Sequence, residues 1–193
     1  MRGLIGIPET TNERYKHYYR EVHMRNSADN PATMLGEMLM CWVWDIQDLC
    51  KRYRPANYLD FGCGKGYAYR NRKVDRLFDC SILMHDIGIP EYSERPDPDI
   101  VDAIVCCDVL EHIPEELLPE VLSYWGRCKP KFVFATVAQY PSVATLADGT
   151  NAHVTQRSRD WWEALLAEHL SCPTVVAFGE TPKRYKTYSY RIK

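Results

Sequence analysis

Residues 57–66 read NYLDFGCGKG, a short apolar run followed by three glycines at alternate positions. The run suits a buried strand, and the glycines suit a tight turn. Glycine tolerates the positive φ of such a turn and lets the backbone approach a ligand closely. We therefore expect a strand, a glycine turn and a helix over 67–73, a unit with which ligand-binding α/β sheets begin.

Further along the chain, short apolar runs alternate with stretches of helical periodicity. The expected strands are 81–85, 103–107 and 131–136, and the expected helices are 114–128 and 158–169. This alternation predicts an α/β fold with a mostly parallel central sheet and helices on both faces. Two final runs, 174–178 and 185–192, are joined by a short connection, so we expect the last strand to be antiparallel.

The first 55 residues open differently, with helical patterns in place of strands. Tyrosines share one helical face over 15–23, and Met34 to Arg52 forms a second apolar helix. This N-terminal helical cap is expected to cover one edge of the sheet, with a substrate-facing cap as the alternative. We expect one domain over 1–193, with the cap at 1–55 and a cofactor-binding core at 56–193.

Composition narrows the class of protein. The 193 residues are 46% hydrophobic and 26% charged, as in ordinary globular domains. A net charge of −2 lacks the basic excess of a protein that binds nucleic-acid phosphates. No apolar run has the roughly 18 to 20 residues needed to cross a bilayer, and no stretch resembles a signal peptide, so we expect a cytoplasmic protein without a membrane partner. Eight cysteines without a CxxC pair predict reduced, packed thiols.

Acidic residues stand at the ends of three expected strands: Asp60, Asp86 and Asp108. Parallel sheets bind ligands at these ends. Asp60 precedes the glycine turn and suits a positively charged amine. Asp86, twenty residues beyond Gly66, suits the hydroxyls of a ribose. A nicotinamide oxidoreductase is an alternative, but Tyr67 stands where the dinucleotide fingerprint has its third glycine.

Two motifs together, DFGCGKG at 60–66 and DVLEHI at 108–113, resemble those of class I S-adenosylmethionine-dependent methyltransferases. The chain looks closest to small bacterial and phage-type members without an assigned substrate, which also share GTNAH at 149–153 and a double tryptophan at 161–162. The resemblance implies a Rossmann-like methyltransferase fold with S-adenosylmethionine as cofactor. The implied cofactor-binding residues are Asp60, Gly62, Cys63, Gly64 and Gly66 for the methionine portion, Asp86 for the ribose, and Asp108 and Val109 for the sulfonium end.

The expected reaction is methyl transfer to an oxygen or nitrogen of a small-molecule or carbohydrate acceptor; a nucleic-acid acceptor is not favoured. If the acceptor is a hydroxyl, a base must take its proton, and a histidine with a pKa near 6.5 suits this task. His153 is the first candidate and His112 the second. We expect the irregular segment 137–157, which carries His153, to form a lid that orders over the cofactor when substrate binds.

A metal is not expected, but one metal set is an open alternative. On a helix beginning near Asp108, the spacing would place Asp108, Glu111 and His112 on one face, where His153 could join them. A similar arrangement occurs in small-RNA 3′-terminal 2′-O-methyltransferases, so metal-assisted transfer to RNA ends is one alternative function. A cofactor-binding protein without transfer activity is another.

Overall fold

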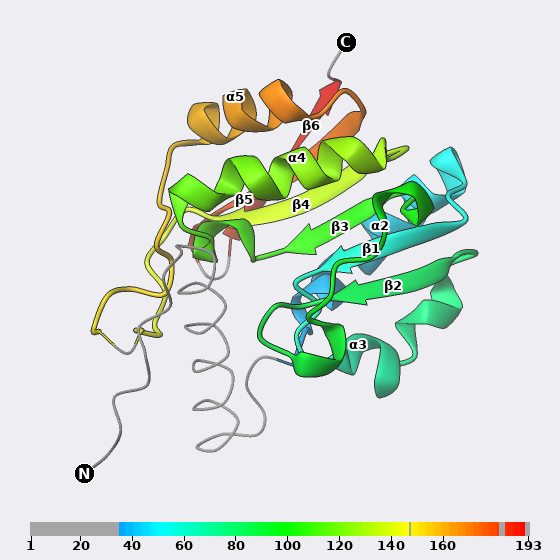
Figure 1. The fold of residues 1–193 in the computed structure, drawn as a ribbon, viewed down its shortest axis with the longest axis horizontal. Coiled ribbons are helices and arrows are strands. Elements are labelled where there is room, and N and C mark those ends of the chain that lie inside the picture. Colours follow the sequence, from blue (N-terminus) through cyan, green and yellow to red (C-terminus); the bar gives the residue numbers. More distant parts are fainter. Residues whose placement is uncertain (1–34, 147, 182–183, 192–193) are drawn as a thin grey trace.

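The computed structural model of the protein describes residues 35–146, 148–181 and 184–191. They form a six-stranded sheet in the order β2-β1-β3-β4-β5-β6 (Figure 1). The tyrosine-bearing pattern expected at 15–23 lies outside the described residues. Of the helices in the described part of the chain, none is long and apolar enough to cross a membrane.

The sheet is mainly parallel. Its strands are β1 (Asn57–Phe61), β2 (Ser81–His85), β3 (Ile104–Cys107), β4 (Val133–Ala138), β5 (Pro173–Thr181) and β6 (Arg184–Arg191). β1 to β5 run parallel, and β6 pairs antiparallel with β5. The predicted α/β class is confirmed, because each apolar run that ends at a turn signal forms a strand.

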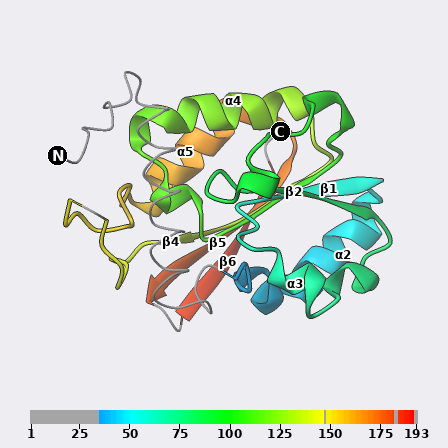
Figure 2. The same cartoon turned by 60° about the horizontal axis from the view of Figure 1, so that its bottom comes forward.

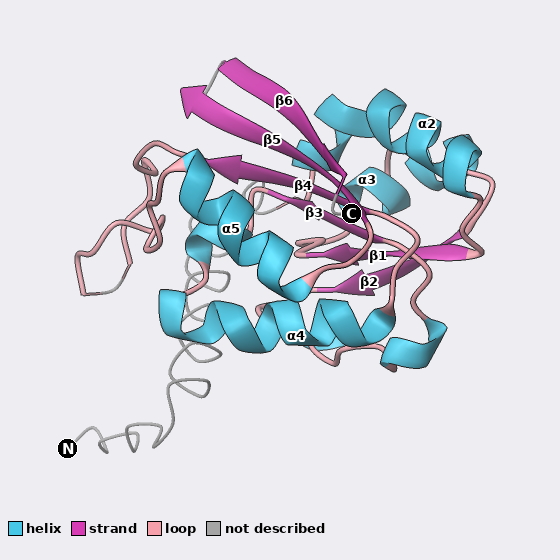
Figure 3. Ribbon diagram, turned by 90° about the horizontal axis from the view of Figure 1, so that it is seen from above, coloured by secondary structure: helices cyan, strands magenta, loops and turns pink. Residues whose placement is uncertain are grey.

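Helices cover both faces of this sheet (Figures 2 and 3). One layer contains α4 (Leu118–Cys128) and α5 (Arg159–His169), and the other contains η1 (Met38–Trp42), α2 (Val43–Tyr53) and α3 (Tyr67–Arg70). The rings of Trp42 and Tyr53 each lie 5.7 Å from a phenylalanine of the β4 region. The helical part of the cap therefore packs on a face of the sheet, and the prediction that it covers an edge is wrong for these residues.

Residues 87–101 connect β2 to β3 without forming a strand. They hold two 3-10 turns, η3 (Pro90–Tyr92) and η4 (Pro98–Ile100), each with a proline in its first turn. Proline has no N–H for a strand ladder, which explains why this stretch adds nothing to the sheet. Helix α3 is shorter than predicted because Lys73 adopts a left-handed φ of 57° soon after its end.

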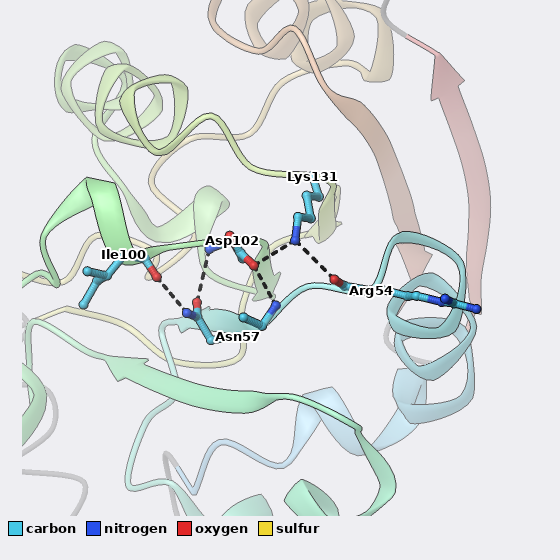
Figure 4. A network of polar contacts seen from close by, with 6 residues as sticks. Arg54, Asn57, Ile100, Asp102 and Lys131 are labelled. Atoms are coloured by element: carbon cyan, nitrogen blue, oxygen red, sulfur yellow. Dashed lines mark hydrogen bonds and ion pairs between the residues drawn. The ribbon is translucent and has the colours of Figure 1, made fainter.

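A polar network holds together the edge of the sheet where β1, β3 and β4 begin (Figure 4). Asp102 Oδ2 accepts hydrogen bonds from the Ala56 amide (2.6 Å) and from Lys131 Nζ (2.9 Å). Lys131 Nζ also donates to the Arg54 carbonyl (3.2 Å), and the Asp102 amide donates to Asn57 Oδ1 (3.1 Å). The Ala56 amide and the Lys131 ammonium lower the pKa of Asp102. Asp102 thus joins the starts of three strands.

Replacing this carboxylate should destabilise the fold. Asp102→Ala leaves the Ala56 amide and the Lys131 ammonium without their acceptor, so we expect it to lower the free energy of unfolding by about 1 to 3 kcal/mol. Lys131→Met removes a partly exposed ion pair and an exposed hydrogen bond to the Arg54 carbonyl and should cost less, about 1 kcal/mol. Urea unfolding at pH 7 measures both. Equal stability of Asp102→Ala and wild type would contradict this role.

Candidate functional site

A cavity of about 290 Å³ opens at the carboxyl ends of β1, β2 and β3. It is lined by the last residue of each strand and by the residue that follows: Phe61 and Gly62, His85 and Asp86, Cys107 and Asp108. β1 lies between β2 and β3. The chain therefore passes from β1 to β2 on one side and then crosses to β3 on the other side of β1. Open α/β sheets bind ligands at such a switch point.

The glycine turn after β1 forms part of the cavity wall. Gly62 has a φ of +89°, and a Cβ added there would lie 2.2 Å from Val109 Cγ2, so no other residue fits. Gly62, Gly64 and Val109 line the cavity. Cys63 and Gly66, which the sequence also assigned to the cofactor, are buried and are not among the lining residues. Their place is inside the turn.

Four N–H groups of this turn are already used within the protein. The Gly62 and Cys63 amides donate to the His85 carbonyl (2.7 and 3.1 Å), the Gly64 amide to Asp86 Oδ2 (2.8 Å), and the Gly66 amide to the Cys63 carbonyl (3.0 Å). The helix that follows, α3, has only four residues. The turn therefore lacks the row of outward N–H groups with which a phosphate-binding loop holds an anion.

Asp86 lies where the sequence predicts it, at the end of β2 and on the cavity wall. Its carboxylate is 7% exposed, with Oδ2 bonded to the Gly64 amide and Oδ1 to the Gly88 amide (2.9 Å). Each carboxylate oxygen has a second lone pair. Asp86 can thus hold the turn and still accept a hydrogen bond from a ligand hydroxyl.

Asp60 lies behind the turn, in contrast to its predicted contact with the ligand. Its side chain is 3% exposed and does not line the cavity, and the Tyr69 hydroxyl donates to Asp60 Oδ2 (2.7 Å). Tyr69 is in turn hydrogen-bonded to Tyr58 (3.1 Å). Burial raises the pKa of Asp60 to about 7, against the opposing effect of the Tyr69 hydrogen bond. Strand alternation explains this, because Asp60 shares the β1 face of Tyr58.

Asp108 lines the cavity but does not begin a helix. Its φ is 55°, in the left-handed region, and only a 3-10 turn, η5 (Leu110–His112), follows. The Asp108 amide donates to Thr136 Oγ1 (2.9 Å), and that hydroxyl donates to Asp108 Oδ1 (2.6 Å). The predicted helix starting at Asp108 is wrong, because Thr136, within β4, holds this residue in a turn.

Glu111, His112 and His153 come together beside the cavity. One ligand atom from each lies within 4.8 Å of the others, a grouping to which Asp108 does not belong. Glu111 is fully buried; one carboxylate oxygen accepts from the Ala138 amide (2.9 Å), and Oε2 has no hydrogen-bond partner in the described structure. Burial, and secondarily the charge of Asp108, raises the pKa of Glu111 well above its usual range.

Both histidines of this cluster have defined orientations. His112 Nδ1 lies 2.9 Å from the Ala152 carbonyl, and His153 Nδ1 lies 2.5 Å from the Tyr140 carbonyl. A carbonyl only accepts, so in each neutral ring Nδ1 carries the proton and Nε2 the lone pair. The ring centroids are 4.7 Å apart. His112 lines the cavity and His153 lies behind it, which reverses their predicted order of approach to an acceptor.

The segment that carries His153 is fixed to η5. The Thr155 amide donates to the Glu111 carbonyl (3.0 Å), and the Thr155 hydroxyl donates to the Ile113 carbonyl (2.6 Å). Among the described residues of 139–157, none lines the cavity. The second half of this segment supports the cluster, and the closing of 137–157 over the cofactor when substrate binds stays a prediction.

Several residues that line the cavity were not predicted from the sequence. Phe61, His85 and Cys107 are the last residues of their strands, and that shared position is the signal that would have found them. The segment Leu35–Met38 also lines the cavity. It carries no such signal, because it lies at the start of a helical region and does not follow a strand.

Comparisons of this chain with protein-family models, with curated proteins and with solved structures found no match. The function is accordingly inferred from the cavity, its charges and the cluster beside it. These features are local, and each can be tested by single substitutions.

The buried Asp60 should make stability depend on pH. Its folded pKa of about 7 exceeds the ordinary value of 3.8, so the folded state holds this proton more tightly and loses stability as pH rises between those values. Asp60→Asn has no such proton. We expect the wild type to lose about 1 kcal/mol per pH unit relative to Asp60→Asn between pH 5 and 6.5, measured by urea unfolding. Parallel pH curves for the two proteins would contradict the raised pKa.

Proposed function

We propose that the protein is a Rossmann-like, S-adenosylmethionine-dependent methyltransferase that moves a methyl group to an oxygen or nitrogen of a small-molecule or carbohydrate acceptor. The observation that carries the proposal is the charge of the cavity. Its wall holds three carboxylates, Glu37, Asp86 and Asp108, and no lysine or arginine among the lining residues described. Such a wall favours a ligand with positive groups.

The bound cofactor would supply a methyl group on a positively charged sulfur, and its amino-acid portion adds an ammonium. A nicotinamide dinucleotide instead carries a pyrophosphate, whose negative charges require free N–H groups or cations. Four of the turn amides are used internally, and the carboxylates would repel a phosphate. These two facts favour the sulfonium cofactor over the dinucleotide.

The chain's own residues can then be given roles. Asp86 accepts the ribose hydroxyls, and Gly62 and Val109 allow close contact with the bound cofactor. Asp108, held by Thr136, lies beside the sulfonium end. Orienting two bound molecules supplies on the order of 7 to 11 kcal/mol of the barrier, so this fixed framework is the main contribution.

A hydroxyl acceptor must also lose a proton. His112 lies on the cavity wall and presents an Nε2 lone pair that can take it, and His153 packs against the His112 ring. A positioned base adds about 10²- to 10⁴-fold in rate. If S-adenosylmethionine is bound, it would supply the methyl group, and His112 would take the proton that the acceptor hydroxyl loses when its oxygen is methylated.

Binding calorimetry tests the cofactor assignment. S-adenosylmethionine should bind one site per chain, and NAD should not compete with it. Asp86→Ala should weaken S-adenosylmethionine binding by about 1.5 to 3 kcal/mol, the scale of a charge-assisted hydrogen bond. Asp160→Ala, an exposed carboxylate on α5, should leave the affinity unchanged. Tighter binding of NAD than of S-adenosylmethionine would reject the proposal.

A second candidate is the same transfer assisted by a divalent metal ion. Glu111 supplies a buried carboxylate oxygen without a partner, and His112 and His153 supply nitrogens whose orientation is set by backbone carbonyls. Ligands at about 2.1 Å from one ion lie at most about 4.2 Å apart, so small shifts would close this set. Two imidazoles and a carboxylate suit Mn²⁺, Co²⁺ or Zn²⁺ better than Mg²⁺. Such an ion would lower the pKa of a hydroxyl acceptor.

Cobalt titration separates a histidine base from a metal site. If the cluster binds metal, chelator-treated protein with reduced thiols should bind Co²⁺ and show its visible absorption, and Glu111→Gln and His153→Ala should weaken binding by about 10²-fold or more. His169→Ala, on α5, is the matched control. No Co²⁺ binding, together with full transfer activity in chelator, would leave the histidine base as the mechanism. In both cases His112→Ala should slow transfer, followed as S-adenosylhomocysteine release, by about 10²-fold with little change in cofactor affinity.

A further inference from the structure

The segment just before η1 lies directly on the glycine turn. The Tyr67 amide donates to the Leu35 carbonyl (2.9 Å). Gly36 has a φ of +75°, and a Cβ added there would lie 2.0 Å from the Cys63 carbonyl oxygen. Only a glycine allows this approach, so the two backbones are in contact and the position of residue 37 over the turn is fixed from one side.

Helical packing fixes the same segment from the other side. The Glu37 carbonyl accepts from the Met40 amide (2.9 Å), which opens η1. Leu39, Val43 and Ile46 are buried against the sheet. Glu37 itself is exposed and lines the cavity. The backbone that carries this carboxylate is therefore fixed beside the cavity, although its sequence neighbourhood carries no recognisable motif.

The other carboxylates near the turn already have partners within the protein. Asp60 accepts from Tyr69, and Asp86 accepts from two backbone amides. Asp108 accepts from Thr136. Among the described residues, none donates a hydrogen bond to the Glu37 carboxylate. Glu37 is thus the carboxylate on the cavity wall with both oxygens open to a ligand.

We propose that Glu37 binds the α-ammonium of the cofactor's amino-acid portion, the role that the sequence assigned to Asp60. This inference rests on the proposed function and deepens it. Asp86 marks the ribose end and Asp108 the sulfonium end, with the glycine turn between them. Glu37 lies over that turn, whereas Asp60 is sealed behind it by Tyr69. A carboxylate facing an ammonium forms a charge-assisted hydrogen bond.

Two ligands that differ in the amino-acid portion test this assignment. S-adenosylhomocysteine carries the ammonium, and 5′-methylthioadenosine lacks the whole amino-acid part. Glu37→Gln should weaken S-adenosylhomocysteine binding by about 10-fold or more and change 5′-methylthioadenosine binding by less than about 2-fold. Asp60→Asn should not produce this selective loss. Glu116→Gln, an exposed glutamate on η6 (Glu115–Leu117), is the matched control and should change neither affinity.

The result that would overturn the role of Glu37 differs from the result that would reject the proposed function. A selective loss in Asp60→Asn, or equal affinities of Glu37→Gln and wild type for S-adenosylhomocysteine, would overturn the role of Glu37 while the cofactor assignment stands. Wild-type protein that binds neither ligand would instead reject the proposed function. Circular dichroism of each variant shows whether the fold is retained.

Discussion

The hydrogen bonds of the Asp86 carboxylate to the Gly64 and Gly88 amides are the constraint on which the candidate site depends. They join the turn after β1 to the turn after β2 in a place that solvent hardly reaches. Hydrogen bonds to a charged group contribute about 1.5 to 3 kcal/mol each. The Gly62 and Cys63 amides add two more bonds across the same gap, to the His85 carbonyl. The cavity wall is therefore rigid before any ligand arrives, which favours precise orientation of what binds.

The same bonds decide which ligands suit the cavity. A glycine turn with outward N–H groups would bind phosphate, but this turn directs the N–H groups of Gly62, Cys63 and Gly64 toward the end of β2. The side chains that line the cavity are carboxylates, two imidazoles and apolar groups. Behind the wall, burial raises the pKa of Asp60 and of Glu111, and the neighbouring carboxylates Asp86 and Asp108 add to this effect. Negative potential without an internal counter-charge is the physical basis for proposing a cationic cofactor.

Much of the frame could be predicted from the sequence, because strands that are buried on both faces are short apolar runs ending in turn residues. β1 and β2 have the predicted bounds. Gly62, Gly64, Asp86, Asp108 and Val109 all line the cavity, and their binding of a cofactor stays a prediction. Asp60 was misplaced because membership of a motif does not tell which face of β1 a side chain takes. The helix expected at Asp108 failed because the Thr136 hydroxyl, from another strand, holds Asp108 in a left-handed turn. Glu37 could not be predicted, since its position depends on a backbone contact between Gly36 and Cys63.

A crystal structure of the protein with S-adenosylhomocysteine tests the central claim most directly. We expect the nucleoside and its thioether to lie in the cavity at the carboxyl ends of β1, β2 and β3. The ribose hydroxyls should lie within hydrogen-bond distance of Asp86, and the sulfur should face Asp108 and His112. An empty cavity at saturating ligand, or a ligand bound away from Asp86 with the glycine turn uncontacted, would contradict it.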